Sequence, residues 1–238
     1  MSSLKDRVII ITGAVGNLGS AVVRRVRAQG GRMVLVDRSD GRLKKTHGDL
    51  KGDVHHWLAS GVDLTDPKAA SDMAAEAFKR FGRIDGLVNT VGGFRGGKPV
   101  HEADLAEWDF LYDINVRTVL NACRAVIPYM LKAQGGRIIN IASRNAFQGS
   151  PNYAAYSATK GMVLRMSESM AGELKTRGIN VNCIVPGTID TPQNRAAMPQ
   201  ADFSAWVPPE DLASVIAFLL SDDARSVTGT AVPVYGRS

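Results

Sequence analysis

The chain has 238 residues, 45% of them hydrophobic and 22% charged, with a formal net charge of +6. This length can bury a sizeable core, and the charged fraction is close to the globular average, which excludes a wholly disordered chain. No apolar run approaches the roughly 18 residues of a membrane span, and the residues before Val8 leave no room for a signal peptide. Cys123 and Cys183 are too few for a disulfide framework or a zinc site. We therefore expect a soluble cytoplasmic protein that does not associate with membranes.

Basic residues concentrate in the first 51 residues, where 11 Lys/Arg and 4 Asp/Glu give a balance of +7 and leave the remaining chain at −1. A basic third could bind nucleic acid, attract an anionic cofactor, or form a solvated helix face. Arg24, Arg25 and Arg27 alternate with apolar valines, which favours the solvated face. No zinc-finger, RNA-recognition or basic-zipper pattern occurs, so we expect no nucleic-acid partner.

Short β-branched runs alternate with helix-period segments along the whole chain. The expected strands are residues 8–12, 32–37, 56–60, 84–89, 137–142, 179–185 and 230–234. The expected helices are residues 18–29, 67–81, 104–132, 153–176 and 209–221. This alternation indicates βαβ units and a doubly wound α/β fold, with about seven parallel strands and helices on both faces of the sheet. No repeat or linker interrupts the pattern, so we predict a single domain over residues 1–238.

A glycine-rich loop, TGAVGNLG at residues 12–19, lies between the first strand and the first helix. Its glycines at 13, 16 and 19 allow a tight turn, close approach of the backbone to a ligand, and close packing of helix on strand. The helix N-terminus presents N–H groups and a positive dipole end to a pyrophosphate. Glycine patterns alone are weak evidence, but the strand–loop–helix context and an acidic residue, Asp37, ending the second strand predict a Rossmann-type dinucleotide site.

Asp37 can accept hydrogen bonds from an adenosine ribose and repels a 2′-phosphate, so NAD(H) is favoured. Arg38 follows it and could hold a 2′-phosphate, which keeps NADP(H) as the alternative. Asp63 and Leu64 follow the third strand, where the carboxylate of Asp63 could accept a hydrogen bond from the adenine amino group. A plain turn aspartate is the other interpretation of Asp63.

With these motifs and those that follow, the chain resembles the short-chain dehydrogenase/reductase family over nearly its whole length. The motifs are the glycine loop (Gly13, Gly16, Asn17, Leu18, Gly19), Asp63, NTVG at 89–92 (Asn89, Gly92), Asn115, Ser143, YSATK at 156–160 (Tyr156, Lys160) and the segment with Pro186, Gly187 and Thr191. Two departures stand out. Asn17 replaces a usual glycine, and we expect the turn to survive because asparagine tolerates left-handed backbone. The usual NNAG reads NTVG here, for which we expect a small change in sheet support.

Two stretches resemble one branch of that family more closely, quinonoid dihydropteridine reductase. They are the glycine loop and residues 190–206, which match that branch's lid almost residue for residue. That branch lacks the family's serine, whereas this chain keeps Ser143 together with Asn115. The resemblance therefore leaves the substrate open.

Tyr156 and Lys160 are four residues apart on an expected helix, so their side chains emerge on one face. A free tyrosine has a pKa near 10, and a neighbouring ammonium stabilises phenolate and lowers that pKa toward neutral pH. The pair could exchange a proton with a carbonyl or alcohol oxygen while a nicotinamide moves hydride. A surface i,i+4 pair is the other interpretation. Tyr153 has no lysine at the corresponding step.

Ser143 ends an apolar strand at the edge where parallel sheets bind ligands, and its hydroxyl could donate to the substrate oxygen. It could equally cap the following loop. Asn115 is polar amid apolar neighbours and needs a hydrogen-bond partner, as a helix-kink residue would too. By resemblance, its carbonyl region anchors a water that joins Lys160 to solvent in a proton relay.

The resemblance also implies that Ile189 meets the nicotinamide carboxamide and that Thr191 fixes the ring face or a phosphate. The four histidines show no ligand spacing, so we predict no metal. A homo-oligomer, dimer or tetramer, is implied as well, with the apolar residues 111–130 and 162–174 at its interfaces.

Residues 188–208 are expected to form a substrate lid. The side chains most able to reach a substrate are Phe94, Ser143, Asn145, Phe147, Phe203 and Trp206. Aromatic faces suit a flat ring, which favours a small cyclic carbonyl or alcohol, although Phe203 and Trp206 could equally serve to bury the lid. Besides an NAD(H)-dependent dehydrogenase/reductase, we consider a dihydropteridine reductase and a catalytically silent cofactor-binding scaffold. A silent scaffold has no need of the whole set Asn115, Ser143, Tyr156 and Lys160.

Overall fold

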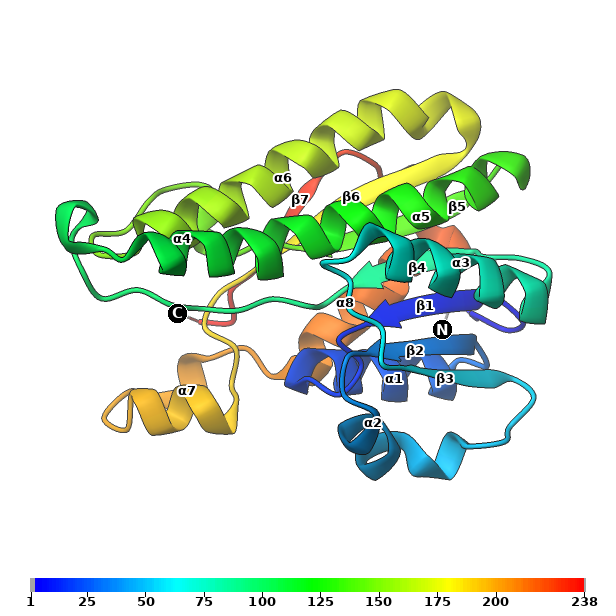
Figure 1. The fold of residues 1–238 in the computed structure, drawn as a ribbon, viewed down its shortest axis with the longest axis horizontal. Coiled ribbons are helices and arrows are strands. Elements are labelled where there is room, and N and C mark those ends of the chain that lie inside the picture. The colour runs from blue at the N-terminus through cyan, green and yellow to red at the C-terminus, as the bar shows by residue number, and fades with distance from the viewer. Residues whose placement is uncertain (1–2, 238) are drawn as a thin grey trace.

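In a computed structural model, which describes residues 3–237, seven parallel strands form one sheet in the order β3-β2-β1-β4-β5-β6-β7 (Figure 1). The chain order reverses between β1 and β4, which is the topological switch point where such sheets bind ligands. The strands are β1 (Val8–Thr12), β2 (Arg32–Asp37), β3 (His56–Ser60), β4 (Gly86–Asn89), β5 (Gly136–Ile141), β6 (Ile179–Pro186) and β7 (Ala231–Val234).

Helices cover both faces of this sheet (Figure 1). They are α1 (Asn17–Ala28), α2 (Asp40–His47), α3 (Pro67–Phe81), α4 (Leu105–Tyr112), α5 (Thr118–Lys132), α6 (Ala154–Leu174), α7 (Pro192–Ala197) and α8 (Pro209–Leu220). One core contains residues of α3, α5 and α6, and the other contains residues of α1, α2 and α8. The doubly wound α/β fold predicted from the sequence is confirmed.

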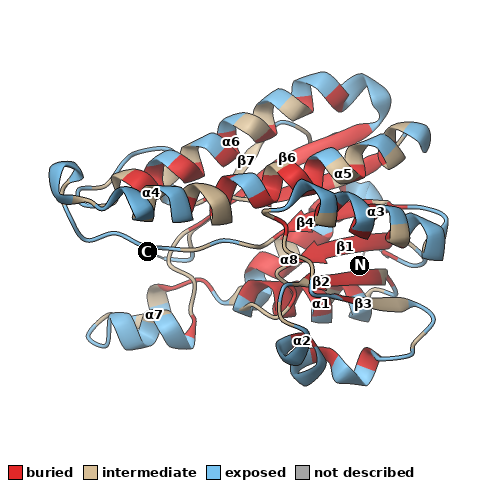
Figure 2. Ribbon diagram, viewed as in Figure 1, coloured by how far each residue is buried: buried red, intermediate tan, exposed pale blue. Residues whose placement is uncertain are grey.

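The central strands are buried on both faces, as Figure 2 shows. In β1, Ile10 packs into one core while Ile9 and Ile11 pack into the other. A strand with two buried faces must be apolar throughout, which explains the continuous β-branched runs in the sequence. Burial of so much apolar surface fixes the sheet, and the sheet in turn fixes where the loops at its carboxyl edge lie.

The predicted bounds of three strands and one helix coincide with the structure, namely residues 8–12, 32–37, 56–60 and 67–81. The helix expected over residues 104–132 is instead two helices, α4 and α5, joined by a π-helical turn at Asp113–Arg117. The side chain of Asn115 in this turn bonds to Gly93 of the loop after β4, and this tertiary contact accompanies the break. Helices α2 and α7 were not predicted, because α2 buries little of its surface and α7 buries no residue.

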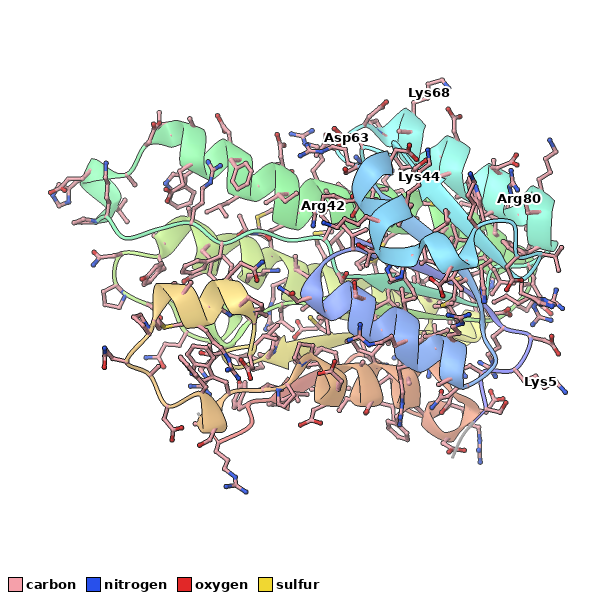
Figure 3. All side chains as sticks on the ribbon, turned by 90° about the horizontal axis from the view of Figure 1, so that it is seen from below. Lys5, Arg42, Lys44, Asp63, Lys68 and Arg80 are labelled. Carbon is pink, nitrogen blue, oxygen red and sulfur yellow. The ribbon has the colours of Figure 1, made fainter. Side chains whose placement is uncertain are left out.

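Charge is spread over the basic N-terminal part. Lys5 lies near the amino end of β1, well away from Arg42 and Lys44 of α2 (Figure 3). Lys44 pairs with Asp40 one helical turn away, as expected of a solvated helix face. Among the described residues, no helix combines the length and the apolar character that crossing a bilayer requires.

Candidate active site

The loop between β1 and α1 has the geometry of a phosphate cradle. Gly13 has a φ of +63°, and a Cβ on Gly19 would collide with the Gly13 carbonyl, so both positions require glycine. Gly16 caps α1 without a side-chain hydrogen bond, and the first turn contains no acidic residue. The amide groups and positive dipole end of α1 are therefore available to an anion, and these features fit the pyrophosphate of a dinucleotide.

The backbone conformation of Asn17 differs from the left-handed one expected from the sequence. It begins α1 with no positive φ, so left-handed backbone is not what preserves the turn. Its side-chain amide instead donates to Gln193 Oε1 of α7 at 2.8 Å. Leu18, next along the loop, is buried against the core that holds α1 and α8.

The predicted adenosine-binding residues follow β2 and β3. Asp37 ends β2, and its Oδ1 accepts from the Ser39 N–H at 2.9 Å. Asp63 Oδ1 accepts from the N–H and the hydroxyl of Thr65, and these bonds lower the pKa of Asp63, with Arg38 acting in the same direction. Asp63 is thus a turn aspartate in its local bonding, and its carboxylate is ionised under the influence of the exposed Arg38.

Leu64 is buried, and its carbonyl accepts from Asn121 of α5 at 2.9 Å. The side chain of Asn89 lies within the sheet, where its Nδ2 donates to Asn140 Oδ1 of β5 at 2.8 Å. Asn89 therefore supports the strand ends beneath the ligand edge. At the next position of the NTVG segment, Thr90 Oγ1 donates to the Thr12 carbonyl at 2.6 Å, which is a hydrogen bond between this loop and β1.

The structure brings three of the four predicted catalytic residues together at the carboxyl end of β5. The Ser143 hydroxyl lies near the phenol of Tyr156, close enough to act on its pKa. Lys160, one turn further along α6, is buried, and its Nζ donates to the carbonyl of Ile141 at 3.0 Å. Ser143 also accepts from the Asn145 N–H at 3.3 Å, so it caps the next turn as well as contacting Tyr156.

Burial dominates the electrostatics of this group. Desolvation raises the pKa of Tyr156, and the hydrogen bond with Ser143 only partly offsets it. The sequence-based expectation of a lowered tyrosine pKa is therefore wrong for the protein alone, because Lys160 directs its ammonium to Ile141. Burial also lowers the pKa of Lys160 to about 8. The phenol is thus a protonated acid at neutral pH.

The fourth residue, Asn115, is fully buried and pairs with the backbone of Gly93 through two hydrogen bonds. Its Nδ2 also approaches the hydroxyl of Thr159 at 3.3 Å. Gly92 lies close to both Asn115 and Lys160: a Cβ at position 92 would be 3.1 Å from Asn115 Oδ1 and 3.3 Å from Lys160 Nζ. Any larger residue at 92 would fill the space beside the lysine.

The loop after β6 leads into the lid. Pro186 ends β6, and the Gly187 N–H donates to Val234 of β7 at 3.0 Å. Ile189 forms a bridge with Val207, and the hydroxyl of Thr191 caps α7. The Ile189–Val207 bridge and the Thr191 cap fix the backbone of the segment predicted to contact the nicotinamide.

The predicted substrate residues differ in exposure. Phe94 is 63% exposed and contacts the Tyr156 ring edge-to-face at 4.9 Å, whereas Trp206 is only 7% exposed and packs on Phe203 at 4.8 Å. Trp206 therefore serves chiefly to bury the lid. Phe147 is exposed, and Asn145 bonds to Ser150 and Ser157 at 3.2 and 3.4 Å.

Sequence reasoning missed two groups that contact residues of the site. The ring of Tyr153 lies 5.2 Å from that of Phe94, although the search for a lysine partner gave it no role. The carbonyl of Ile141, which accepts from Lys160 Nζ, is a main-chain group, so the residue type at 141 could not indicate this role. The periodicity of α6 could have shown Tyr153 close to Tyr156, since residues three apart share a helix face. Residues 3–237 contain no group of three or more His, Cys, Asp or Glu able to hold a metal ion.

A glycine-lined helix N-terminus at the switch point, beside a half-buried tyrosine and a buried lysine, defines a dinucleotide-binding enzyme of the α/β class. Comparison with known proteins gives the family. Residues 7–202 match the family described as short chain dehydrogenase. The chain belongs to the short-chain dehydrogenase/reductase family, and it is an oxidoreductase acting on CH–OH or C=O groups. Members of this family use nicotinamide cofactors.

Individual relatives cover nearly the whole chain. It is 31% identical to 3-oxoacyl-[acyl-carrier-protein] reductase of Thermotoga maritima, over 98% of both chains. It is 30% identical to 7alpha-hydroxysteroid dehydrogenase of Bacteroides fragilis, over 99% of this chain and 95% of that one. The solved structure of levodione reductase superposes with a TM-score of 0.89 at 31% identity, over 98% of this chain and 97% of that chain.

Proposed function

We propose that this protein interconverts a small carbonyl compound and its secondary alcohol with NAD(H), using Tyr156 as the acid/base. The observation that carries the proposal is the placement of the Ser143 hydroxyl near the Tyr156 phenol and beside buried Lys160, at the edge of the sheet where α1 presents its N-terminus. A surface tyrosine–lysine pair would have neither the serine nor the burial.

The residues that would hold the dinucleotide run along the carboxyl edge of the sheet. The α1 N-terminus would take the pyrophosphate, Asp37 the adenosine ribose and Asp63 the adenine. Gly92, Ile189 and Thr191 would contact the nicotinamide end. When bound, the nicotinamide would donate or accept the hydride.

The protein's own part is to hold and move a proton. In the reducing direction, the Tyr156 hydroxyl donates its proton to the carbonyl oxygen, while the Ser143 hydroxyl donates a hydrogen bond to the same oxygen and stabilises the developing alkoxide. Lys160, whose pKa is lowered to about 8, can supply the phenolate with a proton near neutral pH. Asn115 completes the path to solvent through the water that family resemblance places at its carbonyl region.

NAD(H) is preferred over NADP(H) in this proposal. Asp37 ends β2 with only one oxygen taken by the Ser39 N–H, so its other oxygen can bond to a ribose hydroxyl. Arg38 lies beside it but acts electrostatically on Asp63, which supports a role in balancing that carboxylate.

The substrate is a small, cyclic carbonyl or alcohol. Phe94 offers an exposed ring against Tyr156, where a flat substrate could stack. One relative is named for a hydroxysteroid, whose hydroxyl is carried on a ring system. The protein would act as a homo-oligomer, a dimer or tetramer.

An absorbance assay of NADH oxidation tests the proposal. Cyclic and linear ketones are the first substrates, with quinonoid dihydropterin as a separate arm because residues 190–206 resemble the lid of that reductase. Turnover of a ketone supports the proposal. Turnover of dihydropterin alone would assign the second function, and NADH binding without any turnover would indicate a silent scaffold.

A further inference from the structure

The lid, residues 188–208, is fixed firmly at its base. The Asp190 N–H donates to the Val207 carbonyl at 2.8 Å, and the Val207 N–H donates to the Thr188 carbonyl at 2.9 Å. Trp206, next to this bridge, is buried, and the Ala205 carbonyl accepts from the Arg237 N–H at 3.0 Å. The two ends of the lid are therefore tied to each other, and the second end is also bonded to the C-terminal segment.

The tip of the lid is held very differently. Helix α7 has no buried residue and is mostly exposed in Figure 2, and it projects from the carboxyl edge of the sheet in Figure 1. Two side-chain interactions of α7 stay inside the lid: Arg195 pairs with Asp190 at 2.6 Å, and Asn194 Nδ2 donates to the Ile189 carbonyl at 2.8 Å. These contacts shape the lid without attaching its tip.

One side-chain hydrogen bond joins the tip to the phosphate loop. Asn17 Nδ2 donates to Gln193 Oε1 at 2.8 Å, and within residues 3–237 it is the one hydrogen bond or ion pair between α7 and any part of the protein outside the lid. A hollow of about 530 Å³ lies between α1 and the lid, lined among others by Gly16, Asn17 and Pro192. The two elements thus meet across open space, so this single bond sets their separation.

We propose that Asn17 and Gln193 form a clasp that positions the lid over the dinucleotide and slows its release. Asn17 occupies a position where the family's usual loop has glycine, which could not reach α7. Because Asn17 begins α1, the clasp lies next to the N–H groups that would hold the pyrophosphate. The ligand cannot leave along this side without the lid tip moving away. This inference rests on the proposed binding of NAD(H).

The test measures NADH release by stopped-flow fluorescence after mixing with excess NAD⁺, for Asn17→Ala, Gln193→Ala and the double variant. An exposed amide–amide bond is modest, so each single variant should release NADH about two- to tenfold faster. The double variant should behave like either single one, because both remove the same bond. Gln200→Ala, which removes another exposed glutamine of the lid, is the matched control and should release NADH at the wild-type rate.

Hydrogen exchange of residues 192–205 in the protein without NADH gives a second readout that does not depend on cofactor binding. Exchange should be faster in both single variants and unchanged in Gln200→Ala. Unchanged release, unchanged exchange, or effects of the two substitutions that multiply in the double variant would overturn the clasp. If NADH does not bind at all, the proposed function fails, whereas the exchange measurement still decides whether the clasp exists.

Discussion

Gly93 and Asn115 exchange two hydrogen bonds: the Gly93 N–H donates to Asn115 Oδ1 at 2.9 Å, and Asn115 Nδ2 donates to the Gly93 carbonyl at 3.1 Å. This reciprocal pair ties the π turn between α4 and α5 to the loop after β4. It also sets the position of Gly92 beside Lys160. The asparagine thus organises the backbone around the lysine.

Asn115→Ala would leave the Gly93 N–H and carbonyl without their partner. Each buried polar group left unpaired costs about 1–3 kcal/mol, so the free energy of unfolding in urea should fall by that order, and turnover should fall with it. Asn180→Ala is the matched control, because Asn180 is a buried asparagine bonded to Ala224 and Val227, away from the site. A structural role alone would make the two variants lose turnover equally.

The sheet could be read from the sequence because its strands are buried on both faces. All five residues of β1 are buried, and continuous apolar runs of this kind have no competing interpretation next to helical segments. That Ser143, Tyr156 and Lys160 lie at one edge of the sheet was predictable because they stand at a strand end and at i,i+4 positions on a helix. Local pattern and tertiary structure agree there.

Elsewhere tertiary contacts decide, and the sequence pattern carries no trace of them. Helix α7 buries no residue and so shows no apolar periodicity. The π turn accompanies the bonds between Asn115 and Gly93, which are 22 residues apart. The pKa of Tyr156 depends on burial and on Lys160 bonding to a main-chain carbonyl, neither of which a spacing of four residues can show.

The proposed preference for ring substrates should depend on Phe94. Phe94→Ala should lower kcat/KM more for a cyclic ketone than for a matched linear one, because the exposed ring against Tyr156 is lost. Trp206→Ala should lower both equally and reduce the free energy of unfolding by about 3–5 kcal/mol, as expected for a buried tryptophan. Selective loss of cyclic substrates in Trp206→Ala would place the recognition in the lid instead.

Cofactor preference should depend on Asp37. NADH should bind more tightly than NADPH, and Asp37→Ala should narrow the difference, because it removes both a ribose acceptor and the repulsion of a 2′-phosphate. Fluorescence titrations at matched ionic strength measure both dissociation constants. Tighter binding of NADPH to the wild-type protein would make Arg38 the main determinant.

Lys160 should make stability depend on pH. Its pKa is about 8 in the folded protein and 10.5 for a fully solvated lysine, so the unfolded chain binds more protons between these pH values and stability rises with pH there. Relative to Lys160→Met, the wild-type protein should gain about 1 kcal/mol between pH 7 and 9. The raised pKa values of Cys123 and Cys183 lower stability as the pH rises toward and past 9, but both proteins contain these two thiols, so their contribution cancels in the difference. A flat difference between the two proteins would show that Lys160 is not desolvated.

The most direct test of the central claim is the rate of hydride transfer in a single turnover of Tyr156→Phe with NADH and a ketone that the wild-type protein reduces. The substitution keeps the ring and removes only the hydroxyl that donates the proton. We predict unchanged NADH affinity and a rate lower by about 10²–10⁴-fold, the usual contribution of a general acid. A loss of less than tenfold, with chemistry limiting the rate, would contradict the assignment of Tyr156 as the proton donor.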